Sequence, residues 1–95
     1  MMNGEVKHDL NGQKFYMIFD EKEAYLRYLM NDNNVMNMIK TYVPPELRGR
    51  KIADAIVLKA MEYARENNLK IIPTCSYIET FIRRHEEFEN LVKEF

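Results

Sequence analysis

Two adjacent prolines, Pro44 and Pro45, divide the chain into halves with different hydrophobic patterns. Because proline has no backbone N–H and a fixed φ, a central strand that reaches this point must end there. The residues before the prolines form short apolar runs separated by turn-forming residues. The residues after them show apolar positions at helical spacing. The chain is therefore predicted to begin as a sheet and to continue with helices that pack on it.

The first half predicts an antiparallel meander over residues 11–43. Asn11 and Gly12 form the dipeptide that a two-residue type I′ hairpin turn prefers, since both central residues of that turn need positive φ. Strands are expected in three segments rich in aromatic and apolar residues, at 15–19, 24–30 and 35–43. Turns are expected in the charged and polar segments between them, at 20–23 and 31–34.

The second half predicts a helix, a strand and a second helix. The first helix is expected over 47–67 and ends at Asn67 and Asn68, because asparagine tolerates the left-handed conformation of a helix end. Asp54 is assigned to its solvated face. A short strand follows at Ile71, then a helix over 77–85 and a last helix or short strand over 86–95.

A helix that joins two strands of one sheet makes them parallel neighbours, so the strand before Pro44 and the strand at Ile71 are expected to pair in parallel. The fold class is therefore predicted to be α+β: a mostly antiparallel strand meander followed by helix–strand–helix. The 95 residues are expected to form one domain over 1–95.

Composition excludes several classes of function. The formal net charge of −1 provides no general attraction for nucleic acid or for an anionic membrane. No apolar run is long enough for a membrane span, and the N-terminus lacks the pattern of a signal peptide. The single cysteine, Cys75, excludes an internal disulfide and a multi-cysteine zinc site. We expect a cytoplasmic protein without a metal, without a nucleic-acid partner and without a membrane partner.

The segment 43–53 is the candidate binding site because it leads from a strand end into a helix start. Free backbone N–H groups and the helix dipole make such a start suitable for a phosphate or pyrophosphate. Arg48, Arg50 and Lys51 add positive charge there, and Gly49 allows a ligand to approach the backbone closely. A solvated helix start with basic residues is the alternative reading. Clustered cations oppose the dipole, however, and an anion would offset that repulsion.

The same segment resembles the pyrophosphate-binding motif of the Gcn5-related N-acetyltransferase superfamily, Arg/Gln-x-x-Gly-x-Gly/Ala. Arg48 takes its first position, Lys51 its fourth and Ala53 its last. Residues 73–88 resemble a second signature, that of the minimal subfamily often called YjdJ-like, in which a cysteine follows the fifth strand and an Arg-His pair ends the next helix. The resemblance implies a sheet whose two central strands splay apart to admit acetyl-coenzyme A.

By this resemblance the cofactor-binding residues lie in one run: Val43, Arg48, Gly49, Arg50, Lys51, Ile52 and Ala53. The resemblance also implies that the backbone N–H of Val43 polarises the thioester carbonyl. Two residues depart from the pattern. Lys51 replaces the central glycine of the motif, and Lys40 stands where the subfamily usually has histidine. Residue type alone leaves open whether Lys51 pairs with phosphate or hinders the cofactor.

Four residues are candidates for the chemistry. A thiol next to a thioester can accept the acyl group or protonate the leaving thiolate, so Cys75 is the first; the alternative is a small buried filler. Tyr77 and Glu79 are candidates for acid and base because they are near Cys75 in sequence. His85 is a candidate base or, alternatively, a cap at a helix C-terminus.

The resemblance implies an enzyme that transfers an acetyl group from acetyl-coenzyme A to an amine, which is a small molecule, a protein lysine or a protein N-terminus. One alternative is a coenzyme A-binding module of the same fold with weak or lost catalysis. Another is a protein-interaction domain without a ligand. The acceptor is not identified by the sequence, and the expected state is a monomer or a weak homodimer.

Overall fold

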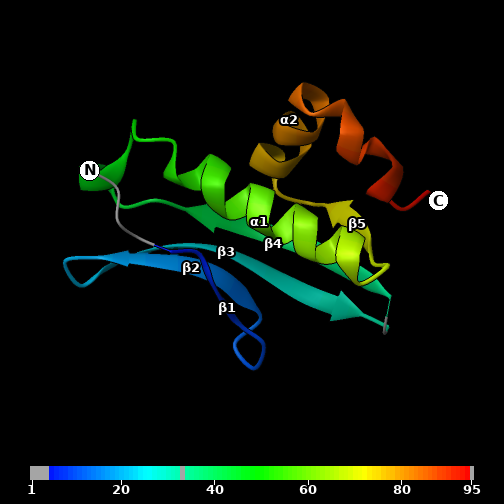
Figure 1. The fold of residues 1–95 in the computed structure, drawn as a ribbon, viewed down its shortest axis with the longest axis horizontal. Coiled ribbons are helices and arrows are strands. Elements are labelled where there is room, and N and C mark those ends of the chain that lie inside the picture. Colours follow the sequence, from blue (N-terminus) through cyan, green and yellow to red (C-terminus); the bar gives the residue numbers. More distant parts are fainter. Residues whose placement is uncertain (1–4, 33, 95) are drawn as a thin grey trace.

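The computed structural model describes residues 5–32 and 34–94. Its centre is a five-stranded sheet in the order β1-β2-β3-β4-β5 (Figure 1). The strands are β1 (Lys7–Asp9), β2 (Lys14–Phe19), β3 (Lys22–Asn31), β4 (Val35–Tyr42) and β5 (Lys70–Pro73). The first four run antiparallel to their neighbours, whereas β5 pairs with β4 in parallel. The predicted meander, the parallel pair and the α+β class are thus confirmed.

The tight hairpin turn lies one hairpin later than predicted. Asn11 and Gly12 belong to a four-residue loop between β1 and β2, and neither has positive φ. The two-residue turn joins β2 to β3, where Asp20 and Glu21 have φ of 48° and 67°. Such values at both central residues are those of a type I′ turn. The strands on each side impose this conformation, although neither residue is a glycine or an asparagine.

The described residues also form two α-helices and two 3₁₀ helices: η1 (Pro45–Leu47), α1 (Ile52–Glu66), α2 (Ser76–Arg84) and η2 (Glu86–Leu91). The prediction that the first helix begins at Leu47 was wrong. Gly49 and Lys51 have φ of 84° and 61°, which a right-handed helix excludes, so α1 begins at Ile52. The predicted end is confirmed: Asn68 has φ of 58°, and the N–H of Leu69 donates to the Ala64 carbonyl at 2.8 Å.

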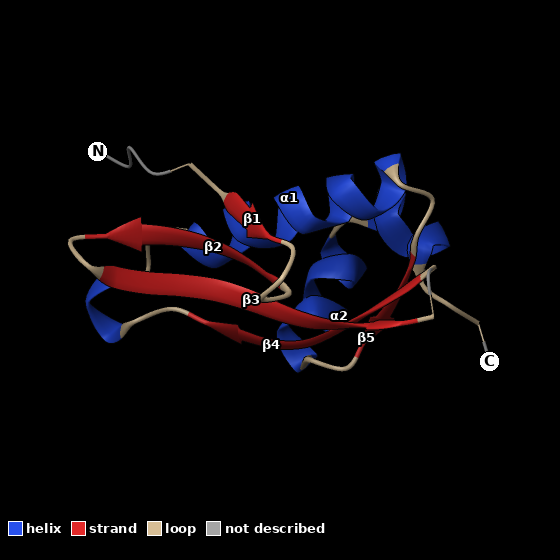
Figure 2. Cartoon of the chain, turned by 90° about the horizontal axis from the view of Figure 1, so that it is seen from below, coloured by secondary structure: helices blue, strands red, loops and turns tan. Residues whose placement is uncertain are grey.

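All helices cover the same face of the sheet (Figure 1). In the middle of the sheet alternate strand residues face the helices and are buried, such as Phe15, Met17, Leu26 and Met38. The opposite face is called the open face, because no helix among the described residues covers it; Figure 2 looks onto it. At the C-terminal end, η2 is followed by a single parallel bridge between Ile71 and Val92. No helix in the described part of the chain is long and apolar enough to cross a membrane.

An irregularity in β4 separates it from β5 near the binding segment. Arg27 pairs with Lys40 but Tyr28 pairs with Met38, so Ile39 is an extra residue in β4. Such a β-bulge bends its strand and disrupts the ladder locally. The last β4–β5 pair is Met38 with Pro73, immediately before the bulge. Beyond this point β4 pairs with β3 only, through Lys40, Thr41 and Tyr42, and its pairing with β5 has ended.

Candidate functional site

A cavity of about 360 Å³ lies between the end of β4 and the beginning of α1. Its lining comes from the end of β4, the segment that follows it and one residue of α2: Thr41, Tyr42, Val43, Leu47, Arg48, Gly49, Lys51, Ile52, Ala53 and Tyr77. The cavity exists because β5 ends while β4 continues beyond the bulge. Its volume is within the range of small-molecule sites. Six of the seven predicted cofactor-binding residues line it; Arg50 is the exception.

The loop before α1 is shaped by two residues with positive φ. Arg48 turns back on the strand end, and its Nε donates a hydrogen bond to the Val43 carbonyl at 2.9 Å. Gly49 has φ of 84°, and a β-carbon there would have no protein atom within 4 Å. Lys51 has φ of 61° and ψ of 26°, in the left-handed region. The fourth motif position thus needs a backbone conformation for which glycine is the usual residue.

The first turn of α1 faces the cavity with backbone donors. The residue before the helix, Lys51, makes no side-chain capping hydrogen bond, and the first hydrogen bond of the helix runs from the Ala55 N–H to the Lys51 carbonyl. Ile52 and Ala53 therefore present N–H groups that precede the helical ladder. With the positive end of the helix dipole and Lys51 beside them, these groups suit an anion such as a pyrophosphate.

Tyr77 and Asp54 form a hydrogen-bonded pair at the side of the cavity. Asp54 lies in the first turn of α1 and accepts a hydrogen bond from the Tyr77 hydroxyl, across from the first turn of α2. Burial of the phenol and this contact with Asp54 raise the pKa of Tyr77 to about 12, against a smaller lowering by Arg84. The Tyr77 hydroxyl therefore keeps its proton at neutral pH. Assignment of Asp54 to the solvated face was incorrect: it is half-buried.

Cys75 is the residue before α2, just after the end of β5, and it lies next to the cavity rather than in its lining. Its backbone N–H donates to the Met38 carbonyl at 3.0 Å, and its Sγ lies 3.5 Å from the Thr41 hydroxyl. Burial acts to raise the pKa of the Cys75 thiol. Contacts with the Thr41 hydroxyl and with the backbone of Tyr77 and Ile78 outweigh burial, so the pKa is lower than usual.

The structure does not bring the other two candidates into the cavity. Glu79 is exposed and pairs with Arg83 at 2.6 Å on the outer side of α2. His85 lies at the end of α2, where its Nδ1 is 2.9 Å from the Phe81 carbonyl and its ring stacks on Phe81 at 3.9 Å. This arrangement is that of a helix cap, the alternative role considered for His85. Among the described residues, no group of three or more His, Cys, Asp or Glu side chains is arranged to hold a metal ion.

Four residues of the site were not predicted as site residues. They are Thr41 and Tyr42 just before the segment 43–53, Leu47 within it, and Asp54 directly after it. Thr41 and Tyr42 carry one usable signal, because they are the last strand residues before the prolines. No sequence signal marks Asp54 as a site residue, since its partner Tyr77 is 23 residues away.

Comparison with known proteins places the fold and this segment among acetyltransferases. A family model described as GCN5-related N-acetyl-transferase matches residues 14–91. The NATD1 protein of Danio rerio is 30% identical over 82 residues, which are 84% of this chain and 74% of that protein. Human NATD1 is 28% identical over 82 residues, with 84% and 73% covered.

A solved structure extends the likeness to the backbone. The NMR structure of a GCN5-like protein from Staphylococcus aureus, described as a candidate N-acetyltransferase, superposes with a TM-score of 0.76. It is 33% identical and covers 100% of this chain and 93% of its own. The family match contains the whole cavity lining, from Thr41 to Tyr77.

Proposed function

Because this chain belongs to the GCN5-related N-acetyltransferase family, we propose that it transfers an acetyl group from acetyl-coenzyme A to an amine. The observation that carries the proposal is the cavity between β4 and α1, in which backbone donors of a helix start meet Arg48, Lys51 and a protonated tyrosine. The donor set suits the negative pyrophosphate. A cavity of this size takes the pyrophosphate and part of the pantetheine arm, while the adenosine lies outside.

Each part of the site has a proposed task. The N–H groups of Ile52 and Ala53 and the Lys51 side chain hold the pyrophosphate, and Gly49 leaves the backbone accessible. Arg48 holds the Val43 carbonyl, so it fixes the segment whose N–H is proposed to polarise the thioester carbonyl. Preorganised donors of this kind stabilise developing negative charge without reorganisation during the reaction.

Acetyl-coenzyme A supplies the acetyl group as a thioester, whose carbon–sulfur bond breaks as the amine nitrogen bonds to the carbonyl carbon. Tyr77 is the proposed proton donor to the departing sulfur, since its raised pKa keeps the proton on the hydroxyl at neutral pH. Before the reaction that proton is donated to Asp54, which holds the hydroxyl at the side of the cavity. As the carbon–sulfur bond breaks, the O–H turns from Asp54 to the sulfur, and the phenolate then regains a proton from water. The amine proton passes to water, because Glu79 is held by Arg83 outside the cavity.

Calorimetric titration with acetyl-coenzyme A tests the proposal together with an acetylation assay on an amine. We expect saturable binding, and Tyr77→Phe should lower turnover by about 100-fold or more with affinity changed less than about twofold. Tyr63→Phe is the matched control, because Tyr63 is also half-buried but lies outside the cavity. Binding without turnover would indicate a coenzyme A-binding module instead, and no binding would indicate an interaction domain.

The role of Cys75 is tested separately by intact mass measurement after incubation with acetyl-coenzyme A. Direct transfer, which we propose, predicts no acetyl adduct on the protein. An adduct that Cys75→Ala abolishes and that an amine discharges would instead assign Cys75 as a covalent carrier. Under direct transfer, Cys75→Ala retains cofactor binding, because Thr41 and not Cys75 lines the cavity.

A further inference from the structure

The open face of the sheet carries two rows of side chains that are in register across three strands. In the first, Lys14 of β2 pairs with Arg27 of β3, which pairs with Lys40 of β4. In the second, two residues further along each strand, Tyr16 pairs with Tyr25 and Tyr25 pairs with Tyr42. The alternate residues of these strands, such as Phe15 and Leu26, face the helices. Both rows therefore lie on the side that Figure 2 presents.

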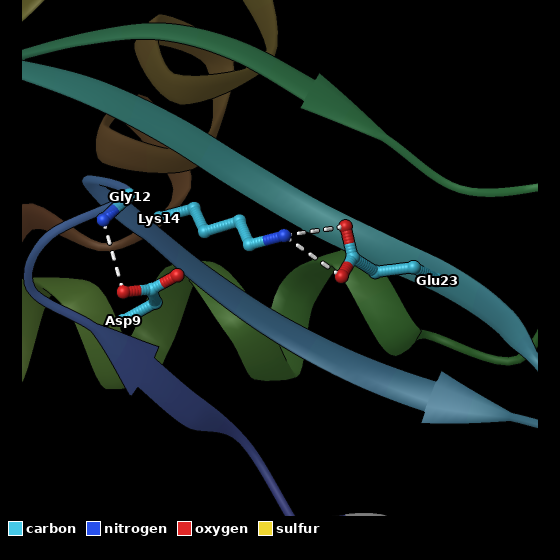
Figure 3. A network of polar contacts seen from close by, with 4 residues as sticks. All are labelled: Asp9, Gly12, Lys14 and Glu23. Atoms are coloured by element: carbon cyan, nitrogen blue, oxygen red, sulfur yellow. Dashed lines mark hydrogen bonds and ion pairs between the residues drawn. The ribbon is translucent and has the colours of Figure 1, made fainter.

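The first row places three cations next to one another. Neighbouring strands are about 4.8 Å apart, and like charges directly opposite each other destabilise a sheet. One of the three is neutralised: Lys14 Nζ reaches along the sheet to both Glu23 oxygens at 2.9 and 3.0 Å (Figure 3). Arg27 and Lys40 are exposed, and neither takes part in an ion pair within the described residues. Two neighbouring exposed cations without an ion-pair partner favour the binding of an anionic partner.

The second row provides contact surface beside that charge. The Tyr25 and Tyr42 rings lie 5.7 Å apart between centroids, and Lys14 Nζ covers the Tyr16 ring at 5.1 Å. Exposed Ile18 (54%) and Leu29 (44%) lie on the same face. Tyrosine and arginine are the residues enriched at protein interfaces, where amphipathic rings bury area at low entropic cost. The face thus combines the composition of a protein interface with unpaired positive charge.

Tyr42 connects this face to the cavity. It is the last residue of β4, it ends the tyrosine row, and it also lines the 360 Å³ cavity. Lys40 is two residues away on the same strand, a separation of about 7 Å. The distance from β2 to β4 along a row is about 10 Å, which an extended peptide spans with about three residues. A segment lying along the rows reaches the cavity at one end.

We propose that the open face binds an acidic polypeptide segment, with carboxylates on Arg27 and Lys40 and with the acceptor amine of that segment at the Tyr42 end, beside the cavity. The amine part of this inference rests on the proposed acetyltransferase function, whereas the docking of the acidic segment does not. We expect the bound segment to be acidic because its carboxylates would complement the charges of Arg27 and Lys40, which lie beside the tyrosine row without an ion-pair partner among the described residues. The tested consequence is a preference for lysines or N-termini within a few residues of glutamate or aspartate.

Three fluorescent octapeptides, each with one lysine, test the docking by anisotropy without any cofactor. Their other residues are glutamates, glutamines or arginines. We expect the glutamate peptide to bind about five- to tenfold more tightly than the glutamine peptide at low salt, with the preference weakened at high salt. Arg27→Glu/Lys40→Glu should abolish the preference. The control Lys59→Glu/Lys93→Glu makes the same change in net charge at exposed positions outside the two rows and should retain it.

If the reversed variant does not fold, Arg27→Gln/Lys40→Gln replaces it. This variant removes like-charge repulsion, so it should lose the preference for the glutamate peptide without losing stability, which a merely structural role would not predict. With acetyl-coenzyme A present, the glutamate peptide should be acetylated with a lower KM than the glutamine peptide. Absence of cofactor binding would contradict the proposed function. The anisotropy measurement needs no cofactor, so it would still show whether the acidic peptide binds to the open face.

Several outcomes would overturn the inference. Equal binding of the glutamate and glutamine peptides would overturn it. So would a control variant, Lys59→Glu/Lys93→Glu, that loses the preference for the glutamate peptide as fully as Arg27→Glu/Lys40→Glu does. Tighter binding of an eight-nucleotide oligothymidylate, lost in the same reversed variant, would assign the face to single-stranded nucleic acid. Self-association that Arg27→Glu/Lys40→Glu abolishes would assign it to a second copy of this chain. A glutamate peptide that binds but is acetylated no better than the glutamine peptide would remove the acceptor role.

Discussion

Lys51 combines an unfavourable backbone conformation with a favourable charge. Its φ of 61° is in the left-handed region, which costs a non-glycine residue about 1 kcal/mol. Lys51 lines the cavity and directly precedes the first N–H groups of α1. The two effects act on different properties, since strain lowers stability while the charge attracts an anion. A single substitution separates them.

Lys51→Gly should stabilise the fold and weaken the binding of coenzyme A. We expect the free energy of unfolding to rise by up to about 0.5 kcal/mol, because the gain from relieved strain slightly exceeds the entropy that glycine adds to the unfolded chain. Affinity should fall several-fold and depend less on salt. Urea denaturation and calorimetry measure the two changes.

Arg50→Gly is the matched control for this prediction. Arg50 is adjacent and carries the same charge, but its φ is not positive and it does not line the cavity. Glycine there should lower stability by up to about 1 kcal/mol and leave affinity nearly unchanged. Tighter coenzyme A binding by Lys51→Gly would show that the lysine hinders the cofactor.

His8 makes the stability of the fold depend on pH. Its Nε2 lies 2.6 Å from the Tyr28 hydroxyl, and its ring stacks on Phe15 at 3.9 Å and meets Tyr63 edge-on at 4.5 Å. Burial lowers the pKa of His8 below 6.5, and Asp9 opposes this only in part. A lowered pKa in the folded state means that the stability contribution is complete above about pH 6.5 and is lost as the pH falls through the folded-state pKa.

His8→Phe should therefore remove part of the decrease in stability between pH 7.5 and pH 5 while keeping the aromatic packing. Chemical denaturation at several pH values measures the free energy of unfolding of the parent and of the variant, and the difference between the two curves gives the contribution of His8. The double variant His8→Phe/Tyr28→Phe controls for the hydrogen-bond partner that Tyr28 loses. An identical pH profile for parent and variant would exclude His8 as the titrating group.

At the scale of elements, the bulge in β4 is the feature that opens the site. Ile39 is the extra residue, and the β4–β5 pairing ends immediately before it. Without a bulge, a regular strand could continue to pair with its parallel neighbour. The cavity would then lose the separation between β4 and the beginning of α2.

Deletion of Ile39 should leave the side-chain alternation intact, because Lys40, Thr41 and Tyr42 keep their partners in β3. We expect a folded protein with a straighter β4 and at least about tenfold weaker coenzyme A binding. Circular dichroism and calorimetry measure the two properties. Ile39→Ala, which retains the bulge, is the control and should bind within about threefold of the parent. Unchanged binding after the deletion would mean that the bulge does not open the site.

At the scale of the whole molecule, cofactor and fold should stabilise each other. A ligand at 100 times its Kd adds about 2.7 kcal/mol to the free energy of unfolding. In a domain of this size, 1 kcal/mol shifts Tm by about 4–8 °C. Coenzyme A at that concentration should therefore raise Tm by about 10–20 °C. Differential scanning fluorimetry measures the shift, with adenosine alone as the control; the absence of a shift at saturating concentration would contradict the site.

Strand and helix types followed from local pattern wherever one face of an element is buried. The run of aromatic and apolar residues that contains Phe15 and Met17 predicted a strand, and the spacing of Ile56, Val57 and Ala60 predicted a helix; these residues pack in the same core. The end of α1 at Asn67 and Asn68 was predictable for the same kind of reason, because the helix end and its preferred residues are a local matter. Resemblance to a family, rather than pattern, indicated the cofactor.

Three features could be decided only by the tertiary structure. The I′ turn formed at Asp20 and Glu21 because strand pairing on both sides imposes positive φ against residue preference. The start of α1 moved to Ile52 because two residues of the loop before it turn the chain out of the helical conformation. The pairing of Asp54 with Tyr77 joins two helices 23 residues apart, which no local spacing encodes.

The site as a whole also combines features set by local sequence with features set by tertiary packing. The sequence by itself determined that a basic, glycine-containing segment leads into a helix start, because backbone donors and charge there depend only on neighbouring residues. Whether these donors face a cavity depends on the bulge at Ile39 and on where β5 ends. The open face depends likewise on register, since Lys14, Arg27 and Lys40 become neighbours only when three strands pair. Contacts between distant segments arise from the packing of the whole sheet, and the tertiary structure alone decides them.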